Sequence, residues 1–222
     1  METKLTRRHL QRAALGVPAP LALALLTGRG AGITFAQSTQ VPATPPVEAT
    51  PILAPTSACD DRDDDDLDTT LAQTEGPYFT PNSPERASLL EDGMPGTKLV
   101  VTGYVYSTDC KPIAEALFES WQCDDVGEYD NVGYTLRGHQ FTDKEGRFEL
   151  TTIVPGIYPG RTRHIHVKVQ APNGPILTSQ LYFPDEEQNG SDGIFDPSLV
   201  VDMEVADQAQ LAFFNFVLEP VE

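Results

Sequence analysis

The stretch around which this chain is organised is Arg161-Thr162-Arg163-His164-Ile165-His166-Val167-Lys168-Val169. It is rich in Val and Ile, which favour β-strands, and it holds two of the four histidines in the sequence. Because side chains alternate between the two faces of a strand, His164 and His166 point to the same side, about 6–7 Å apart along the strand. Two imidazoles on one rigid strand can bind one metal ion. Taken alone, the pair is equally consistent with ordinary packing.

Nearby residues favour the metal site. Tyr158 lies six residues before His164, Arg161 lies three before it, and Tyr129 lies further upstream in Gly127-Glu128-Tyr129-Asp130. Each has a simpler interpretation as well. The tyrosines could anchor or pack loops, and Arg161 could form a surface ion pair.

The rest of the pattern predicts an all-β domain. Strands are expected at residues 98–106, 116–122, 141–152 (two strands around a turn at 142–147), 164–170, 176–183 and 211–218. One helical turn is expected within 204–214, and no long amphipathic helix is found. We therefore expect an antiparallel β-sandwich. The loops at about 124–140 and 184–203 are too long for simple hairpins, and loops of that length are often functional.

The first 36 residues are typical of an export signal. Arg7-Arg8 is a twin-arginine pattern, the run 13–26 is apolar, and small residues at 34–36 offer a cleavage site. Pro18, Pro20 and the shortness of the run argue against a stable membrane span. We expect a periplasmic or extracellular protein, the alternative being a tail with accidental arginines.

Residues 37–66 are expected to form a tether. The segment 37–57 is rich in Pro and Thr and almost uncharged, and residues 60–66 form an acidic run. That run lacks the glycine and the closing glutamate of a calcium loop, so a solvated acidic segment is favoured. Residues 67–222 remain for one domain with a proper core.

The net charge of −18 disfavours nucleic-acid binding, because an acidic surface repels phosphate backbones. The charge says little about a small substrate, since one local arginine can outweigh a distant field.

Three cysteines in an exported protein suggest one disulfide and one remaining thiol. Cys110 and Cys123 flank the strand expected at 116–122, which would hold them more than about 20 Å apart, whereas a disulfide needs Cα atoms within about 7 Å. Cys59 is therefore the expected partner of one of them, and which one stays open.

Five segments resemble the intradiol ring-cleavage dioxygenases, the non-haem iron enzymes that open catechol rings in aromatic-compound catabolism. They are Thr74–Phe79, Trp121–Asp124 with Gly127–Tyr129, Arg137-Gly138 with Thr142-Asp143 and Gly146, Pro155–Arg161, and His164–His166. The resemblance covers roughly residues 74–185, and the three cysteines and the run 158–162 resemble an exported branch. It implies a prealbumin-like β-sandwich and a homodimer.

The resemblance also implies the site. One ferric ion, Fe(3+), would be held by Tyr129, Tyr158, His164 and His166. Tyr158 would leave the metal and accept a substrate proton, Arg161 would stabilise charge on the ring, and Gln180 would be the active-site glutamine. Both atoms of O2 would enter a catechol-type substrate, giving a muconate-type diacid. The donor set fits, because phenolate oxygen is a hard anionic ligand for a hard cation.

This sequence departs from the family near Tyr158. Its spacing to His164 is shorter than in the larger enzymes, and Thr162-Arg163 replaces their usual Pro-Ala. A more open pocket is expected, suited to bulkier catechols. Two other classes remain open: an exported β-sandwich that binds phenols without catalysis, and a copper or zinc enzyme that uses the His-x-His strand.

Overall fold

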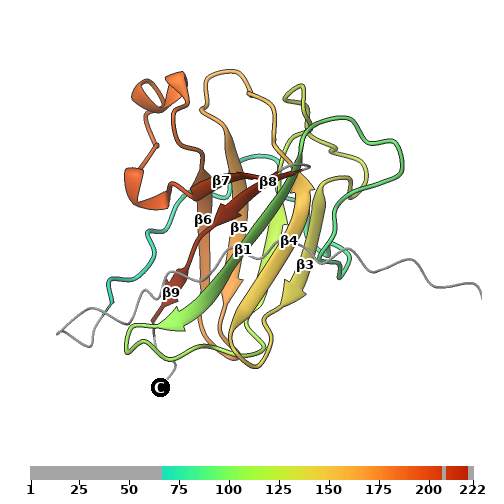
Figure 1. Cartoon of the computed structure of the whole chain (residues 1–222). Helices are drawn as coiled ribbons and strands as arrows, with labels where there is room; N and C mark the ends of the chain where they lie inside the picture. The colour runs from blue at the N-terminus through green and yellow to red at the C-terminus, as the bar shows by residue number, and fades with distance from the viewer. Residues whose placement is uncertain (1–66, 207–208, 220–222) are drawn as a thin grey trace, which may run out of the picture. The chain divides into compact units, whose positions relative to one another are not determined.

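Nine strands form two sheets in the part of the chain that the structure, a computed structural model, describes: residues 67–206 and 209–219 (Figure 1). The expected export signal (1–36), the tether (37–66) and Cys59 lie outside these residues and stay predictions.

The first sheet is built on the longest strand, β1. Its order is β4-β1-β8-β7, with β9 also paired to β1. The bounds are β1 Lys98–Ser107, β4 Arg147–Ile153, β7 Asp202–Ala206, β8 Ala209–Phe213 and β9 Phe216–Leu218. β4 runs antiparallel to β1, whereas β8 and β9 run parallel to it.

The second sheet is antiparallel throughout and carries the histidines. Its order is β3-β2-β5-β6, with bounds β2 Leu117–Trp121, β3 Arg137–Phe141, β5 His164–Gln170 and β6 Ile176–Tyr182. In this register Trp121 pairs with His166, and His166 pairs with Gln180. Two predicted site residues are therefore neighbours across strands.

The core lies between the two sheets and fixes which face of β5 is free. Phe118 of β2 stacks on Phe148 of β4 with ring centroids 4.2 Å apart, so side chains of opposite sheets meet. Ile165, Val167 and Val169 of β5 belong to the same core cluster. Burying a side chain of this size stabilises the fold by about 1.5–3 kcal/mol. The alternation along β5 therefore turns His164 and His166 to the other face, on a strand anchored by its apolar side.

Most expected strands are confirmed, and the β-sandwich is confirmed. The helical turn expected within 204–214 is wrong, because β7 and β8 pair there as an antiparallel hairpin. The strands β3 and β7 were not expected as separate elements.

The long loop after β6 contains two short 3-10 segments, η1 Glu187–Gly190 and η2 Pro197–Leu199. Among the described residues no helix is long and apolar enough to cross a membrane.

The two cysteines in the described part of the chain differ in their bonding state. Cys123 is a free, buried thiol, and Cys110 is disulfide-bonded. The expectation that Cys110 and Cys123 do not pair is thus confirmed. Of the two partners considered for Cys59, Cys123 is excluded.

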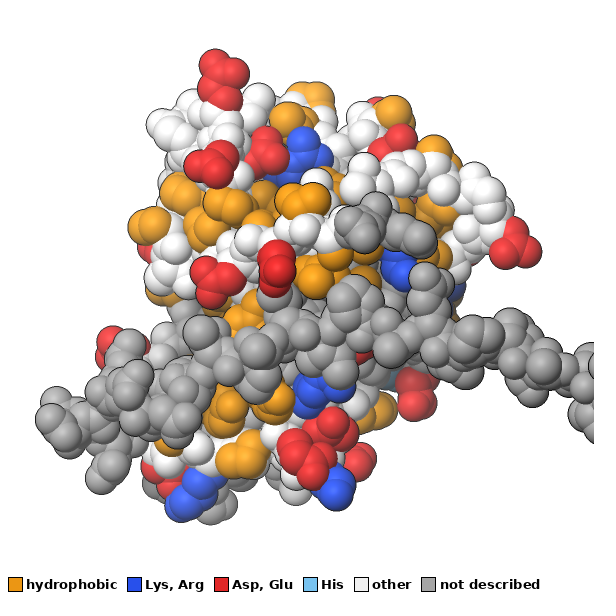
Figure 2. Space-filling view, in the orientation of Figure 1, with side chains coloured by type: hydrophobic (Ala, Val, Ile, Leu, Met, Phe, Trp, Pro, Cys, Tyr) orange, Lys and Arg blue, Asp and Glu red, His pale blue; other side chains and the backbone are white. Residues whose placement is uncertain are grey.

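Acidic side chains are spread over the face drawn in Figure 2, including its upper and lower ends. This distribution agrees with the strongly negative net charge of the sequence, and such a surface repels polyanions.

Candidate metal centre

One end of the second sheet gathers the predicted site residues. Trp121 ends β2, His164 begins β5 and pairs with Tyr182, and Tyr182 ends β6. The β4–β5 loop, which carries Tyr158 and Arg161, and the 3-10 segments lie at this upper end (Figure 1). Several loops therefore meet over the histidine face of a rigid strand.

The two histidines converge on one point. Both are buried, at 3% and 2% exposure. Nδ1 of His164 lies 2.6 Å from the carbonyl oxygen of Thr162. A carbonyl only accepts, so Nδ1 carries the proton and Nε2 presents its lone pair. That Nε2 lies 3.2 Å from Nε2 of His166. Metal–imidazole bonds are about 2.0–2.1 Å long in zinc sites, so one ion can reach both nitrogens.

Packing fixes the ring of His166. It stacks on Trp121 with centroids 5.0 Å apart and planes at 5°. On another side Gly76 approaches so closely that an added Cβ would lie 3.2 Å from Cε1 of the imidazole, and its φ of +71° is itself unfavourable for other residues. The ring is therefore held in place without a hydrogen bond at Nδ1, for which the described part of the chain offers no partner.

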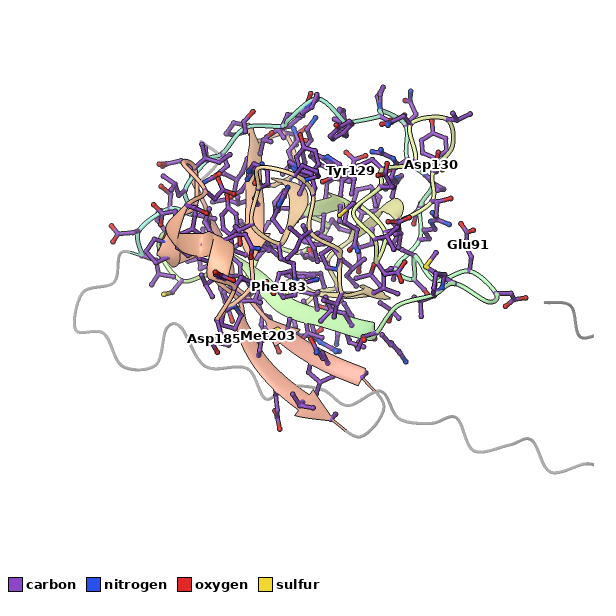
Figure 3. All side chains as sticks on the ribbon, turned by 90° about the horizontal axis from the view of Figure 1, so that it is seen from above. Glu91, Tyr129, Asp130, Phe183, Asp185 and Met203 are labelled. Atoms are coloured by element: carbon purple, nitrogen blue, oxygen red, sulfur yellow. The ribbon has the colours of Figure 1, made fainter. Side chains whose placement is uncertain are left out.

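The two predicted tyrosines lie beside the histidines. The rings of Tyr129 and Tyr158 are 6.1 Å apart, and Tyr129 is 6.3 Å from His166. Tyr78 stacks on Tyr129 at 4.4 Å and meets Tyr158 edge-on at 5.6 Å. Figure 3 looks down on this end of the molecule, with Tyr129 over the strand ends and Asp130 farther out in the same loop. The structure thus brings all four predicted ligands to one place.

The hydroxyl of Tyr129 is buried and has no hydrogen-bond partner among the described residues. A buried polar atom without a partner costs about 1–3 kcal/mol, and such atoms are few in native proteins. An oxygen of this kind, on a ring whose centroid lies 6.3 Å from that of His166, fits a metal ligand better than a loop anchor.

Burial controls the protonation of these groups. It lowers the pKa of His164 to about 4 and holds the pKa of His166 well below its ordinary value. It also raises the pKa of Tyr129 above that of a free tyrosine. The imidazoles are therefore neutral and ready to coordinate at physiological pH. A bound cation would reverse the effect on tyrosine, because a metal stabilises the phenolate.

The donors at this centre are of mixed type. Among residues 67–206 and 209–219, no group of three or more His, Cys, Asp or Glu is placed to hold a metal ion. The histidine pair would instead be completed by phenol oxygens. Two anionic oxygens and two neutral nitrogens suit a highly charged, hard cation such as Fe(III), whose charge they largely neutralise.

Arg161 and Gln180 lie next to this centre and bind each other. Nη2 of Arg161 donates to Oε1 of Gln180 at 2.6 Å, and Nε2 of Gln180 donates to the carbonyl of Thr74 at 3.0 Å. Gln180 is fully buried and pairs with His166. The charge of Arg161 contributes to lowering the pKa of His164 and of His166. A surface ion pair is thus the wrong description of Arg161.

Three further residues complete the arrangement and were not predicted. The hydroxyl oxygen of Tyr182 accepts a hydrogen bond from Nη2 of Arg161 at 3.3 Å. Asp192 pairs with Arg161. Arg137, almost fully buried, donates to the carbonyls of Asp130 and Tyr78 and so ties the loop of Tyr129 to the N-terminal segment.

Two of these residues carried a signal in the sequence. Tyr182 is two residues after Gln180 on a strand and thus on the same face. Arg137 stands within a segment that resembles the family. No signal in the sequence pointed to Asp192, because its position depends on the path of a long loop.

The low pKa of His164 predicts acid sensitivity of the metal-free protein. Free histidine titrates near 6.5, so between pH 6.5 and about 4 the unfolded chain binds a proton there that the folded chain does not. The free energy of unfolding should therefore fall as the pH is lowered through this window. Urea unfolding of metal-free protein measures it. The change from pH 7 to pH 4.5 should be smaller in His164→Asn, and an equal change in both proteins would contradict the effect.

Comparisons with known proteins show what the chain as a whole is similar to. A family described as Dioxygenase matches residues 74–220. The hydroxyquinol 1,2-dioxygenase of a Rhizobium strain is 29% identical over 62% of this chain and 56% of its own length. The chain spans about half the length of the curated relatives it matches.

Solved structures are similar as well. The dioxygenase domain of a dioxygenase–carbohydrate-binding protein fusion from the cellulolytic bacterium Streptomyces sp. SirexAA-E is 52% identical. It aligns with 69% of this chain and 100% of its own length at a TM-score of 0.68. The 3-chlorocatechol 1,2-dioxygenase of Rhodococcus opacus 1CP is 28% identical over 68% of this chain and 73% of its own, with a TM-score of 0.64.

Proposed function

The chain belongs to the intradiol ring-cleavage dioxygenases, and from this premise we propose that it inserts both atoms of O2 into a catechol-type aromatic and opens the ring to a muconate-type diacid. The observation that carries the proposal is the convergence of two neutral imidazoles beside the ring of Tyr129, whose buried hydroxyl has no hydrogen-bond partner among the described residues. Tyr158 lies against Tyr129 in the same cluster.

We propose that Tyr129, Tyr158, His164 and His166 hold Fe(III). The bound ion would coordinate the catechol oxygens and make the ring reactive toward O2. Imidazoles kept neutral by burial need no deprotonation before they bind. Tyr158 is a half-buried residue, and its phenolate oxygen is proposed to receive a proton from the catechol and become a neutral hydroxyl.

Arg161 and Gln180 are proposed to act on the substrate rather than on the metal. A guanidinium held beside the centre can stabilise negative charge that develops on the ring, and it does so without reorganising during the reaction. Gln180 orients that guanidinium through its hydrogen bond and adds a polar wall to a site otherwise lined by aromatic rings.

Oxygen consumption tests the proposal directly. The iron-loaded chain is expected to consume one O2 per catechol, and with ¹⁸O2 the diacid should carry two labelled oxygens. Iron-loaded protein that binds catechol without oxygen uptake would favour the non-catalytic alternative. Activity that requires copper or zinc, and survives Tyr129→Phe, would favour the other metalloenzyme.

The short segment between Tyr158 and His164 predicts a tolerant pocket. Only five residues separate them, so little chain is available to wall the site, and we expect catechols with bulky substituents to be cleaved about as well as catechol. Comparing kcat/KM for catechol, protocatechuate, hydroxyquinol and larger catechols measures this. Strict preference for unsubstituted catechol would contradict it.

We also propose export by the twin-arginine route and assembly as a homodimer. The first rests on Arg7-Arg8 and the apolar run 13–26, and the second on resemblance to the family alone.

A further inference from the structure

Asp192 lies in the loop between β6 and β7, two residues after η1. Its side chain is only 2% exposed, and no other Asp or Glu in the described part of the chain is buried. A buried carboxylate is costly unless it is paired and hydrogen-bonded, so its contacts indicate what it stabilises.

The carboxylate of Asp192 joins two separate segments. Oδ2 accepts from Nε of Arg161 at 2.8 Å and from the backbone N–H of Thr162 at 2.9 Å. Oδ1 accepts from the backbone N–H of Ile194 at 3.1 Å. Although burial alone raises the pKa of Asp192, these donors lower it below the ordinary value. Asp192 therefore stays ionised and opposite the guanidinium.

These contacts fix the orientation of Arg161. Asp192 holds Nε, while Oε1 of Gln180 and the hydroxyl of Tyr182 lie within hydrogen-bond distance of Nη2. A guanidinium is a rigid planar fork, so contacts at two of its nitrogens define its plane. Among the hydrogen bonds of the described residues, Nη1 makes none, which leaves it available to a substrate.

A second ion pair crosses between the same two segments and serves as a comparison. Arg163 pairs with Glu186, and its Nη1 donates to the carbonyl of Pro155. In the described part of the chain Arg163 has no hydrogen bond to Gln180, Tyr182 or the four predicted ligands. Two ion pairs thus connect the loop after β6 to the segment before β5. Only the pair of Asp192 with Arg161 is continued by hydrogen bonds to residues of the candidate centre.

Resting on the proposed function, we propose that Asp192 is a positioning residue for ring cleavage: it holds Arg161 so that Nη1 faces the substrate. The carboxylate does not touch the substrate itself. Its contribution is to the orientation of a charge that stabilises the reacting ring.

The test is Asp192→Asn in the iron-loaded full chain, with Glu186→Gln as the matched control. Asparagine keeps the size and one acceptor oxygen, but it removes the negative charge opposite Arg161 and replaces the second oxygen with an NH2 donor, so Nε of Arg161 and the backbone N–H groups of Thr162 and Ile194 can no longer all be satisfied. Loss of a residue that orients a metal ligand costs about 10–100-fold in affinity or activity. We expect a loss of the same order for the residue that orients Arg161, so kcat per bound iron should fall by about 10–100-fold, with KM changed less. The visible absorption band should be unchanged, since the ligands are intact. Glu186→Gln should keep the wild-type kcat.

A double-mutant cycle separates positioning from general stability. If Asp192 acts through Arg161, Asp192→Asn should lower kcat little further in an Arg161→Ala background. A purely structural role would lower the melting temperature and leave kcat per bound iron unchanged. An unchanged kcat in Asp192→Asn, or full additivity in the cycle, overturns the proposal.

Asp192→Glu provides a second variant if Asp192→Asn does not fold. It keeps the charge but moves the carboxylate by one methylene, so the protein should fold and kcat should still fall, whereas wild-type kcat would overturn the proposal. Wild-type protein in the same assay distinguishes failure of the proposed function from failure of the proposed role of Asp192. An inactive wild type overturns the proposed function and this inference together, while an active wild type matched by Asp192→Asn overturns this inference alone.

Discussion

His164→Ala is expected to remove bound iron and catechol turnover together. Nε2 of His164 is one of two nitrogens that converge within 3.2 Å, and alanine has no atom to replace it. Changing residues that merely orient metal ligands costs about 10–100-fold in affinity or activity, so the loss of a direct ligand should exceed about 100-fold. Iron analysis of the purified protein and oxygen uptake measure the two effects.

His139→Ala is the control for that experiment. His139 lies on β3, is partly exposed, and contacts Ser83 rather than the cluster. It should keep both iron and turnover. A His164→Ala protein that retained the wild-type iron content would contradict the ligand set.

Arg161→Met is expected to separate metal binding from chemistry. Methionine keeps much of the aliphatic length but removes the charge and the hydrogen bond to Gln180. Removing one preorganised stabilising donor from an active site costs about 10²–10³-fold in kcat. The iron content should stay at the wild-type level, because Arg161 is not a ligand. Steady-state kinetics per bound iron gives the effect.

Arg163→Met provides the comparison within the same segment. Arg163 is also partly buried and ion-paired, but with Glu186, away from Gln180. Its kcat should remain near wild type. An equal loss of kcat in Arg161→Met and Arg163→Met would mean that any change in this segment impairs turnover. It would contradict a specific role of Arg161.

The sequence predicted best those parts of the molecule whose structure depends on near neighbours. β5 was placed correctly because its Val and Ile residues alternate with side chains of the other face, and one of those faces belongs to the core. The closeness of Gln180 to His166 follows from a hairpin of two strands, which fixes the register.

Contacts between residues far apart in the sequence could not be predicted from the local sequence pattern. The helical turn expected within 204–214 was wrong because β8 is stabilised by parallel pairing with β1, more than 100 residues away in sequence. Asp192 was missed for the same reason: its carboxylate meets Arg161 only through the folding of the loop after β6. That the hydroxyl of Tyr129 is buried without a hydrogen-bond partner in the described part of the chain is likewise a consequence of packing.

The visible spectrum of the purified, iron-loaded protein tests the central claim most directly. Tyrosinate bound to Fe(III) gives a reddish charge-transfer band, and we expect that band to move to longer wavelength when catechol is added without oxygen. It should then return to its starting position when O2 is admitted and consumed. A protein that stays colourless after loading with iron would contradict the site that Tyr129, Tyr158, His164 and His166 are proposed to form.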